Sequence, residues 1–298
     1  VGRSLGKRVG ETIIQRHPEL KTRFSLFDFG AVVAAASLAH DLGNPPFGHA
    51  GEDAISVYFR RRPELARQVT PHQWSDLVSF EGNAQGFRIL NQRGACLRLT
   101  LATLGAFTKY PCASAFTPRD PKRKSQKKFG FFDSERSLFA EIAANLELRE
   151  AGSSGWARHP LAFLVEAADD ICYSIIDLED GCNLGLIPFD ETVELLAPIL
   201  GKSLDRPKLV REGSLKTKLG TLRALAIGEL IDACTTVFLD NEPGILSGDF
   251  DSALTDLGPH REALKMISKQ SVERIYRARQ VVEVEAAGHE VLPGLLDE

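Results

Sequence analysis

The feature that most constrains the fold is an uncharged apolar segment, residues 31–39, that runs into a histidine, an aspartate and a rigid turn. Its composition and length predict a buried helix. Gly43 and the run Asn44-Pro45-Pro46 then end this helix, because proline lacks the N–H group that a further helical turn needs. The pair His40 and Asp41 is therefore predicted to lie at the last turn of a buried helix.

A second pair follows the turn. His49 and Glu52 are three residues apart at the start of the next predicted helix, so they share one of its faces. Two imidazoles and two carboxylates so close together along the chain suit a hydrolytic metal site. The alternative interpretation is structural: His40 and Asp41 as a core histidine and a capping aspartate, and His49 as a helix-capping residue.

Residues 161–178 form another strongly apolar segment and predict a second buried helix. Asp169, Tyr173 and Asp177 recur within it at every fourth position, which makes one polar line along the helix. A buried carboxylate is costly unless it is paired, hydrogen-bonded or bound to a metal. Asp169 is therefore a candidate third ligand of an ion such as Mn, Mg, Fe, Co, Ni or Zn. The alternative is that Tyr173 is a core residue and Asp177 the exposed partner of an arginine.

The rest of the chain predicts an all-α fold, because helical spacing recurs and alternating strand patterns are nearly absent. Further helices are expected at residues 1–15, 51–61, 80–90, 97–107, 134–148, 191–200, 215–238 and 261–285. We expect one domain over residues 1–298, with the metal and catalytic core in residues 1–190 and a C-terminal helical part in residues 191–298.

Composition narrows the class of protein. The five cysteines are odd in number and form no CxxC pair, which is typical of reduced thiols in a cytoplasmic protein. No apolar run is long enough to span a bilayer, so we expect a soluble protein without a membrane partner. The net charge of −4 gives no general attraction to nucleic acid, so any anion-binding patch must be local.

One local patch is a loop at residues 117–128 that runs into the sequence Phe-Gly-Phe-Phe. Its basic residues are Arg119, Lys122, Arg123, Lys124, Lys127 and Lys128. Such a run is either a solvated face or a surface for a phosphate-rich ligand.

Four blocks of sequence, in this order along the chain, resemble the deoxynucleoside triphosphate triphosphohydrolases of the HD-domain superfamily, the dGTPase-like proteins. The blocks are residues 40–49 with Glu52, residues 80–85, residues 128–135 and residues 166–181. The resemblance implies an HD-type helical core with additional C-terminal helices. It also implies an enzyme that hydrolyses dGTP or other dNTPs to deoxynucleoside and inorganic triphosphate.

The resemblance assigns roles to the candidate residues. His40, Asp41 and Asp169 would hold one divalent ion (manganese, magnesium, nickel, cobalt or iron), together with a histidine expected just before Val1. His49, oriented by Glu52, would be the general acid or base. Tyr173 would fill the space of a 2′-hydroxyl, and Asp177 would accept from the 3′-hydroxyl. The donors to the triphosphate would be Asn83, Lys109, Tyr110 and Lys128, with Glu81 and Gln85 in supporting or structural roles.

The resemblance also implies partners and leaves alternatives. Family members are often homo-oligomers, commonly hexamers, and some respond to a nucleotide effector or to single-stranded DNA. One alternative is a degenerate HD protein that binds nucleotide or nucleic acid as a sensor without turnover. Another is an HD hydrolase of nucleoside monophosphates or cyclic nucleotides, which the long-phosphate donor set of Asn83, Lys109 and Lys128 argues against.

Overall fold

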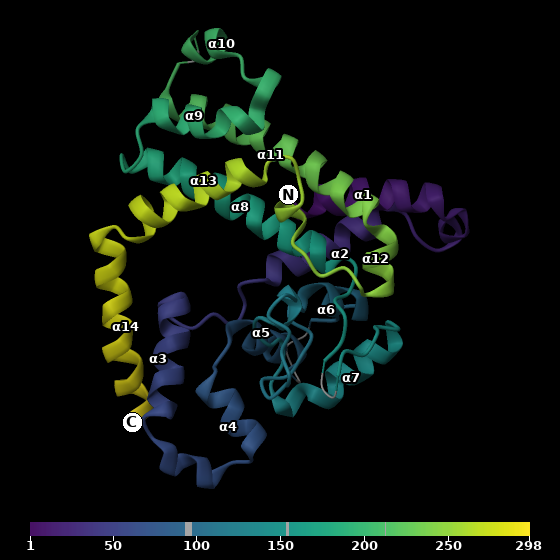
Figure 1. Ribbon diagram of the computed structural model, residues 1–298, viewed down its shortest axis with the longest axis vertical. Coiled ribbons are helices and arrows are strands. Elements are labelled where there is room, and N and C mark those ends of the chain that lie inside the picture. Colours follow the sequence, from purple (N-terminus) through teal and green to yellow (C-terminus); the bar gives the residue numbers. More distant parts are fainter. Residues whose placement is uncertain (93–96, 153–154, 212) are drawn as a thin grey trace. The chain divides into compact units, whose positions relative to one another are not determined.

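The computed structural model describes residues 1–92, 97–152, 155–211 and 213–298 (Figure 1). Within these ranges the chain forms fourteen α-helices and no strand, and only isolated β-bridges join loop residues. The all-α fold predicted from the sequence is confirmed.

The described residues form two compact units that interleave along the chain. The first unit comprises Val1–Ala31, Glu166–Asn241 and Ala253–Val281. The second unit comprises Val32–Val165, Glu242–Ser252 and Val282–Glu298. Each unit therefore combines early and late segments of the chain. The assignment of one domain to the whole chain stays a prediction.

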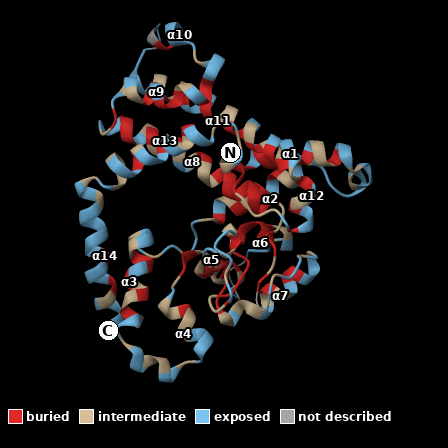
Figure 2. Ribbon diagram, in the orientation of Figure 1, coloured by how far each residue is buried: buried red, intermediate tan, exposed pale blue. Residues whose placement is uncertain are grey.

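The first unit is a layered helical assembly around α11. Its helices are α1 (Gly2–Arg16), the start of α2 (Leu26–Ala39), most of α8 (Ala162–Asn183), α9 (Phe189–Leu200), α10 (Arg206–Arg211), α11 (Leu215–Asp240) and α13 (Arg261–Ser271). Helices α1 and α9 pack against α11, and α13 packs against α9. The apolar faces of α1 and α11 are buried, as Figure 2 shows. On α8 the buried side chains Ile171, Ile175 and Leu178 form the core-facing side.

The second unit is built around an aromatic core. Its helices are the end of α2, α3 (Gly48–Arg60), α4 (Pro71–Val78), α5 (Gly82–Asn91), α6 (Leu101–Phe107), α7 (Arg136–Asn145), α12 (Glu242–Ser247) and most of α14 (Arg279–Asp297). Phe131 stacks on Phe139 with ring centroids 4.7 Å apart, and Phe87 meets Phe139 at 5.6 Å. Phe131 is fully buried. The aromatic run beside the basic loop is thus part of the hydrophobic core rather than a surface for a ligand.

The basic loop uses its two arginines to fold itself. The Arg119 guanidinium donates to the carbonyl groups of Gln126 and Lys128 at 2.7 and 2.6 Å. It also donates to the carbonyl groups of Ala113 and Ser114, just before the loop. Arg123 pairs with the buried carboxylate of Asp251 at 3.1 Å. These two cations satisfy internal acceptors, so they do not add to a solvated basic face.

Several helices differ from those predicted. Residues 261–285 do not form one helix, because α13 passes into a π-helix, Val272–Tyr276, before α14 begins. Helix α6 starts later than expected, since the Thr100 side chain caps it by accepting from the Thr103 backbone N–H. An unexpected helix, α4, starts with a reciprocal capping box between Thr70 and Gln73.

Two expectations from composition concern the thiols and the membrane. Cys112, Cys172, Cys182 and Cys234 are free thiols, while Cys96 lies outside the described residues. In the part of the chain that the structure describes, no helix combines the length and hydropathy needed to cross a membrane.

The turn after α2 packs backbone against backbone on the first turns of α5. A Cβ atom on Gly43 would lie 2.2 Å from the backbone nitrogen of Gly86, and one on Gly86 would lie 2.1 Å from the carbonyl oxygen of Leu42. Gly43 also has a φ of 99°, which glycine tolerates best. Only glycine fits at both positions, so α5 holds the turn that follows His40 and Asp41.

Helix α14 holds the other end of the same turn. Phe47 immediately precedes α3 and has a φ of 68°. Gly288 of α14 packs against its ring, since a Cβ atom on Gly288 would lie 2.8 Å from Cγ of Phe47. Farther along, Asp297 accepts hydrogen bonds from Tyr58 at 2.9 Å and from Arg62 at 2.8 Å. Helices α3 and α14 therefore run side by side in the same direction (Figure 1).

The glycine contact can be tested with two identical substitutions in helix interiors. Gly86→Ala should lower the free energy of unfolding by about 1–3 kcal/mol, because the methyl group overlaps the Leu42 carbonyl. Gly228→Ala in α11 meets no atom within 4 Å and should raise it by about 0.5–1 kcal/mol through helix propensity. Urea denaturation followed by circular dichroism measures both changes. Equal effects of the two substitutions would contradict the packing described here.

Candidate functional site

The His40 ring is oriented by the helix that precedes it. Its Nδ1 lies 2.7 Å from the Ser37 carbonyl oxygen, which can only accept, so Nδ1 carries the proton and donates. In the neutral ring Nε2 is then the acceptor nitrogen, and it lies 3.2 Å from Oδ2 of Asp41. Two acceptors at this distance repel each other unless a proton or a cation lies between them. Neighbouring ligand atoms around one divalent ion are also roughly 3 Å apart, so the pair fits a metal ion.

Asp41 is held by the turn that follows it. The Asn44 amide donates to Oδ1 of Asp41 at 3.0 Å, which leaves Oδ2 on the side of His40. The Asn44 side chain packs directly against Gly82 at the start of α5: a Cβ atom added to Gly82 would lie only 2.5 Å from Oδ1 of Asn44. An outer hydrogen bond of this kind orients a ligating carboxylate.

The third predicted ligand belongs to the other unit. Asp169 is a half-buried residue of α8 in the first unit, whereas His40 and Asp41 belong to the second unit. Among the described residues, no three histidine, cysteine, aspartate or glutamate side chains come together in a group that could hold a metal. The complete ligand set of His40, Asp41 and Asp169 therefore stays a prediction.

Glu52 is buried, with 8% of its surface exposed, and both of its oxygens have partners. Oε1 accepts from the Gly82 backbone N–H at 2.7 Å, and Oε2 lies 3.3 Å from Nζ of Lys128. His49 is an exposed residue of the first turn of α3. No hydrogen bond joins Glu52 to His49 in the described part of the chain, so their pairing stays a prediction.

Glu81 is a second buried carboxylate, 4% exposed, at the N-cap of α5. It accepts from the Asn83 side-chain amide at 2.6 Å and from Nζ of Lys128 at 2.9 Å. Burial of the Lys128 ammonium lowers its pKa, but attraction to Glu81 and Glu52 outweighs burial and raises the pKa above the ordinary value. Two of the four predicted triphosphate donors, Asn83 and Lys128, thus share one carboxylate.

The other two predicted donors lie on a segment next to Lys128. Lys109 has its ammonium 5.9 Å from the ring centroid of Tyr110, whose side chain is buried. A Cβ atom on Gly130 would lie 2.4 Å from the Tyr110 carbonyl oxygen. The Gly130 backbone N–H donates to the Cys112 carbonyl oxygen at 3.1 Å. The second unit therefore brings the segments of Lys109 and Lys128 together.

The predicted sugar-binding pair lies on α8 in the first unit. Tyr173 is 57% exposed, and its ring centroid lies 5.4 Å from that of Tyr276. The Tyr276 hydroxyl donates to Oδ2 of Asp177. Burial raises the pKa of Asp177, and this hydrogen bond opposes the rise because it stabilises the charged carboxylate. Burial and the bond to Asp177 raise the pKa of Tyr276.

Tyr276 is a candidate site residue that sequence reasoning missed. It lies 99 positions after Asp177, at the end of the π-helix. The sequence predicted a continuous α-helix there, and no local pattern marks either the π-helix or a tyrosine that reaches α8.

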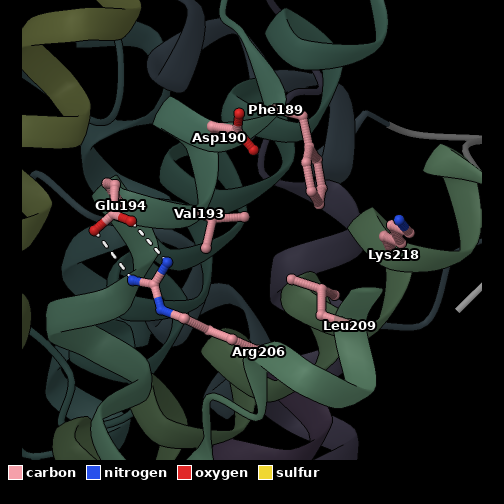
Figure 3. A pocket seen from close by; sticks show the side chains of 7 residues that line it. All are labelled: Phe189, Asp190, Val193, Glu194, Arg206, Leu209 and Lys218. Atoms are coloured by element: carbon pink, nitrogen blue, oxygen red, sulfur yellow. Dashed lines mark hydrogen bonds and ion pairs between the residues drawn. The ribbon is translucent and has the colours of Figure 1, made fainter. Parts of the chain in front are cut away.

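The structure also contains a pocket of about 240 Å³ in the first unit, between α9, α10 and α11 (Figure 3). Phe189, Val193 and Leu209 give it an apolar lining. Arg206 forms two hydrogen bonds across it to Glu194, at 2.7 and 3.1 Å. None of the predicted site residues lines this pocket, and it contains no imidazole.

Comparison with known proteins gives the family. No protein-family model matches the chain. It is 44% identical to the deoxyguanosinetriphosphate triphosphohydrolase-like protein of Synechocystis sp., over 99% of this chain and 69% of the relative. The protein of the same name from Pseudomonas aeruginosa is 38% identical, over 100% of this chain and 68% of the relative. The deoxyguanosinetriphosphate triphosphohydrolase of Klebsiella pneumoniae is 27% identical, over 98% of this chain and 67% of the relative. The chain therefore belongs to the deoxyguanosinetriphosphate triphosphohydrolase-like family.

Proposed function

We propose that the protein hydrolyses deoxynucleoside triphosphates, dGTP among them, to the deoxynucleoside and inorganic triphosphate. The observation that carries this proposal is that Nε2 of His40 lies 3.2 Å from Oδ2 of Asp41, on a turn that packs against α5. That arrangement suits a hydrolytic metal centre. The family name supplies the substrate class.

His40, Asp41 and Asp169 would hold one divalent cation, with manganese and magnesium as the first candidates. When bound there, such an ion supplies Lewis-acid polarisation of the α-phosphate. The chain prepares its own ligands: Ser37 orients the His40 ring, and Asn44 orients the Asp41 carboxylate.

The proton chemistry is assigned to His49. In the net reaction a water oxygen bonds to the α-phosphorus, the bond from phosphorus to the 5′-oxygen breaks, and the 5′-oxygen gains a proton. An imidazole can take the proton from the water or deliver it to the 5′-oxygen near neutral pH. The exposed position of His49 on the first turn of α3 allows either contact.

The deoxyribose is assigned to α8. The exposed ring of Tyr173 offers an apolar face that would fill the space of a 2′-hydroxyl, while Asp177 would accept from the 3′-hydroxyl. Tyr276 supports this assignment, because its ring packs against Tyr173 and its hydroxyl donates a hydrogen bond to Asp177. The triphosphate would be bound by Asn83, Lys109, Tyr110 and Lys128.

The first prediction concerns the products. Full-length protein with manganese and dGTP should release deoxyguanosine and tripolyphosphate in equal amounts, measured by ion-exchange chromatography. Asp169→Asn should reduce this activity by about 100-fold or more through loss of metal binding, without a change in thermal unfolding. The exposed Asp240→Asn at the end of α11 is the matched control and should behave as wild type.

Other products would point elsewhere. Pyrophosphate or phosphate, or turnover of monophosphates alone, would contradict the proposal and favour a different HD hydrolase. Nucleotide binding without any product would favour the sensor. Normal turnover by Asp169→Asn would remove the metal assignment.

The second prediction concerns selection of the sugar. Tyr173→Ala should reduce the ratio of kcat/KM for dGTP to that for GTP by about tenfold, because the space for a 2′-hydroxyl opens. Leu184→Ala, which truncates an exposed side chain just beyond α8, should leave the ratio unchanged. Steady-state kinetics with both nucleotides measures the ratio. An unchanged ratio in Tyr173→Ala would show that another residue excludes ribonucleotides.

The third prediction concerns Tyr276 and needs no substrate. Tyr276→Phe removes a hydrogen bond that lowers the Asp177 pKa, so the carboxyl should titrate at higher pH than in wild type. Carbon-13 NMR of the aspartate carboxyl groups measures the midpoint. Tyr58→Phe removes the same kind of bond to Asp297 and should leave the Asp177 midpoint in place. A midpoint that falls in Tyr276→Phe would contradict the described contact.

A further inference from the structure

Two of the four donors that the proposed function assigns to the triphosphate, Asn83 and Lys128, are already occupied by an anion of the protein itself. We propose that Glu81 is a positioning residue that competes with the polyphosphate for Lys128 and Asn83 and thereby sets how tightly the substrate is held. This inference rests on the proposed function and names a regulator of the same site.

The contacts of Glu81 are those of a bound anion. Its carboxylate lies 2.9 Å from Nζ of Lys128 and accepts from the Asn83 amide at 2.6 Å and from the Asn83 backbone N–H at 3.3 Å. An ammonium, a side-chain amide and a helix N-terminal N–H are the donors that a phosphate group uses. The carboxylate thus satisfies a donor set that also suits a phosphate oxygen.

The local charge makes Glu81 a competitor of an incoming anion. Glu81 and Glu52 are both buried and share the single ammonium of Lys128, so the three groups carry one excess negative charge. The N-terminus of α5 offsets part of this charge, since its first backbone N–H groups donate to the two carboxylates. A polyphosphate must overcome this negative charge to reach Lys128, whose side chain is 27% exposed and hence open to a ligand on one side.

The competition links the phosphate subsite to the predicted acid–base pair. Oε2 of Glu52 is held by Lys128. When a phosphate oxygen takes over the ammonium, Oε2 loses that partner and becomes available to His49. Loss of the Glu81 charge should therefore tighten phosphate binding, because one competitor for the ammonium is removed.

This behaviour separates a positioning role from a structural one. Glu81 is also the N-cap of α5, and loss of a cap would weaken binding and turnover together. Glu81→Gln keeps an acceptor for Asn83 but removes the charge. Glu81→Asn provides a second uncharged variant with a side chain that is among the best N-caps, in case the first variant fails to fold.

The experiment is a double-mutant cycle on binding of magnesium tripolyphosphate, measured by isothermal titration calorimetry with full-length protein in a fixed excess of magnesium. Glu81→Gln should bind the ligand about threefold to tenfold tighter than wild type, because one buried negative charge is removed. Lys128→Met should bind it about tenfold more weakly, because one charged donor is lost. The double variant should show no gain over Lys128→Met alone, because the gain acts through the ammonium. Asp76→Asn, which neutralises another buried carboxylate of the same unit, is the control and should match wild type.

Each other outcome overturns the inference. Unchanged or weaker binding by both folded Glu81 variants would make Glu81 a cap and nothing more. An equal gain in the Lys128→Met background would mean a general charge effect rather than competition for that ammonium. Absence of tripolyphosphate binding by wild type would show that these donors hold no polyphosphate.

Kinetics give an independent readout. Glu81→Gln should lower KM for dGTP, whereas a structural defect would raise KM. The binding cycle does not depend on turnover, so it can succeed even if dNTP hydrolysis is not observed. Absence of triphosphate release by wild type would refute the proposed function alone.

Discussion

The close approach of two backbones, the turn after α2 and the first turns of α5, is the contact on which the candidate site of the second unit depends. Gly43 and Gly86 have no side chain to hold the two backbones apart, and a Cβ atom at either position would overlap backbone atoms of the other segment. The turn holds the paired imidazole and carboxylate at the end of α2, and the N-terminus of α5 binds the buried carboxylates. One steric constraint therefore supports both the predicted metal ligands and the predicted phosphate donors.

Electrostatics follow from this packing. Burying a carboxylate costs several kcal/mol unless charged and hydrogen-bonding partners compensate. Glu52 accepts a hydrogen bond from the Gly82 backbone N–H at the start of α5, and Glu81 caps the same helix. Two carboxylates are therefore buried near each other. Lys128 lies between them and supplies the charge that their burial requires. A lysine assigned to substrate from the sequence thus also has a role in the stability of the protein.

The sequence could predict local features and could not predict long-range pairs. The end of α2 follows from glycine and proline, and the polar line on α8 follows from helical spacing, because both depend on residues a few positions apart. The pairing of Lys128 with Glu81 spans 47 positions, and that of Tyr276 with Asp177 spans 99. Composition also cannot separate a buried aromatic run from an exposed one: the aromatic run beside the basic loop lies in the core, with Phe131 fully buried. The π-helix interrupts a segment whose apolar spacing is continuous, which periodicity alone cannot reveal.

The contact between Gly288 and Phe47 joins α14 to the residues just before the predicted acid–base histidine. Phe47 stands two positions before His49 in a left-handed backbone conformation, with the glycine of α14 against its ring. Asp297 also joins the far end of α14 to Tyr58 and Arg62, so α14 contacts the chain at both ends of α3. The backbone just before the predicted acid–base histidine therefore takes its shape in part from a late segment of the chain.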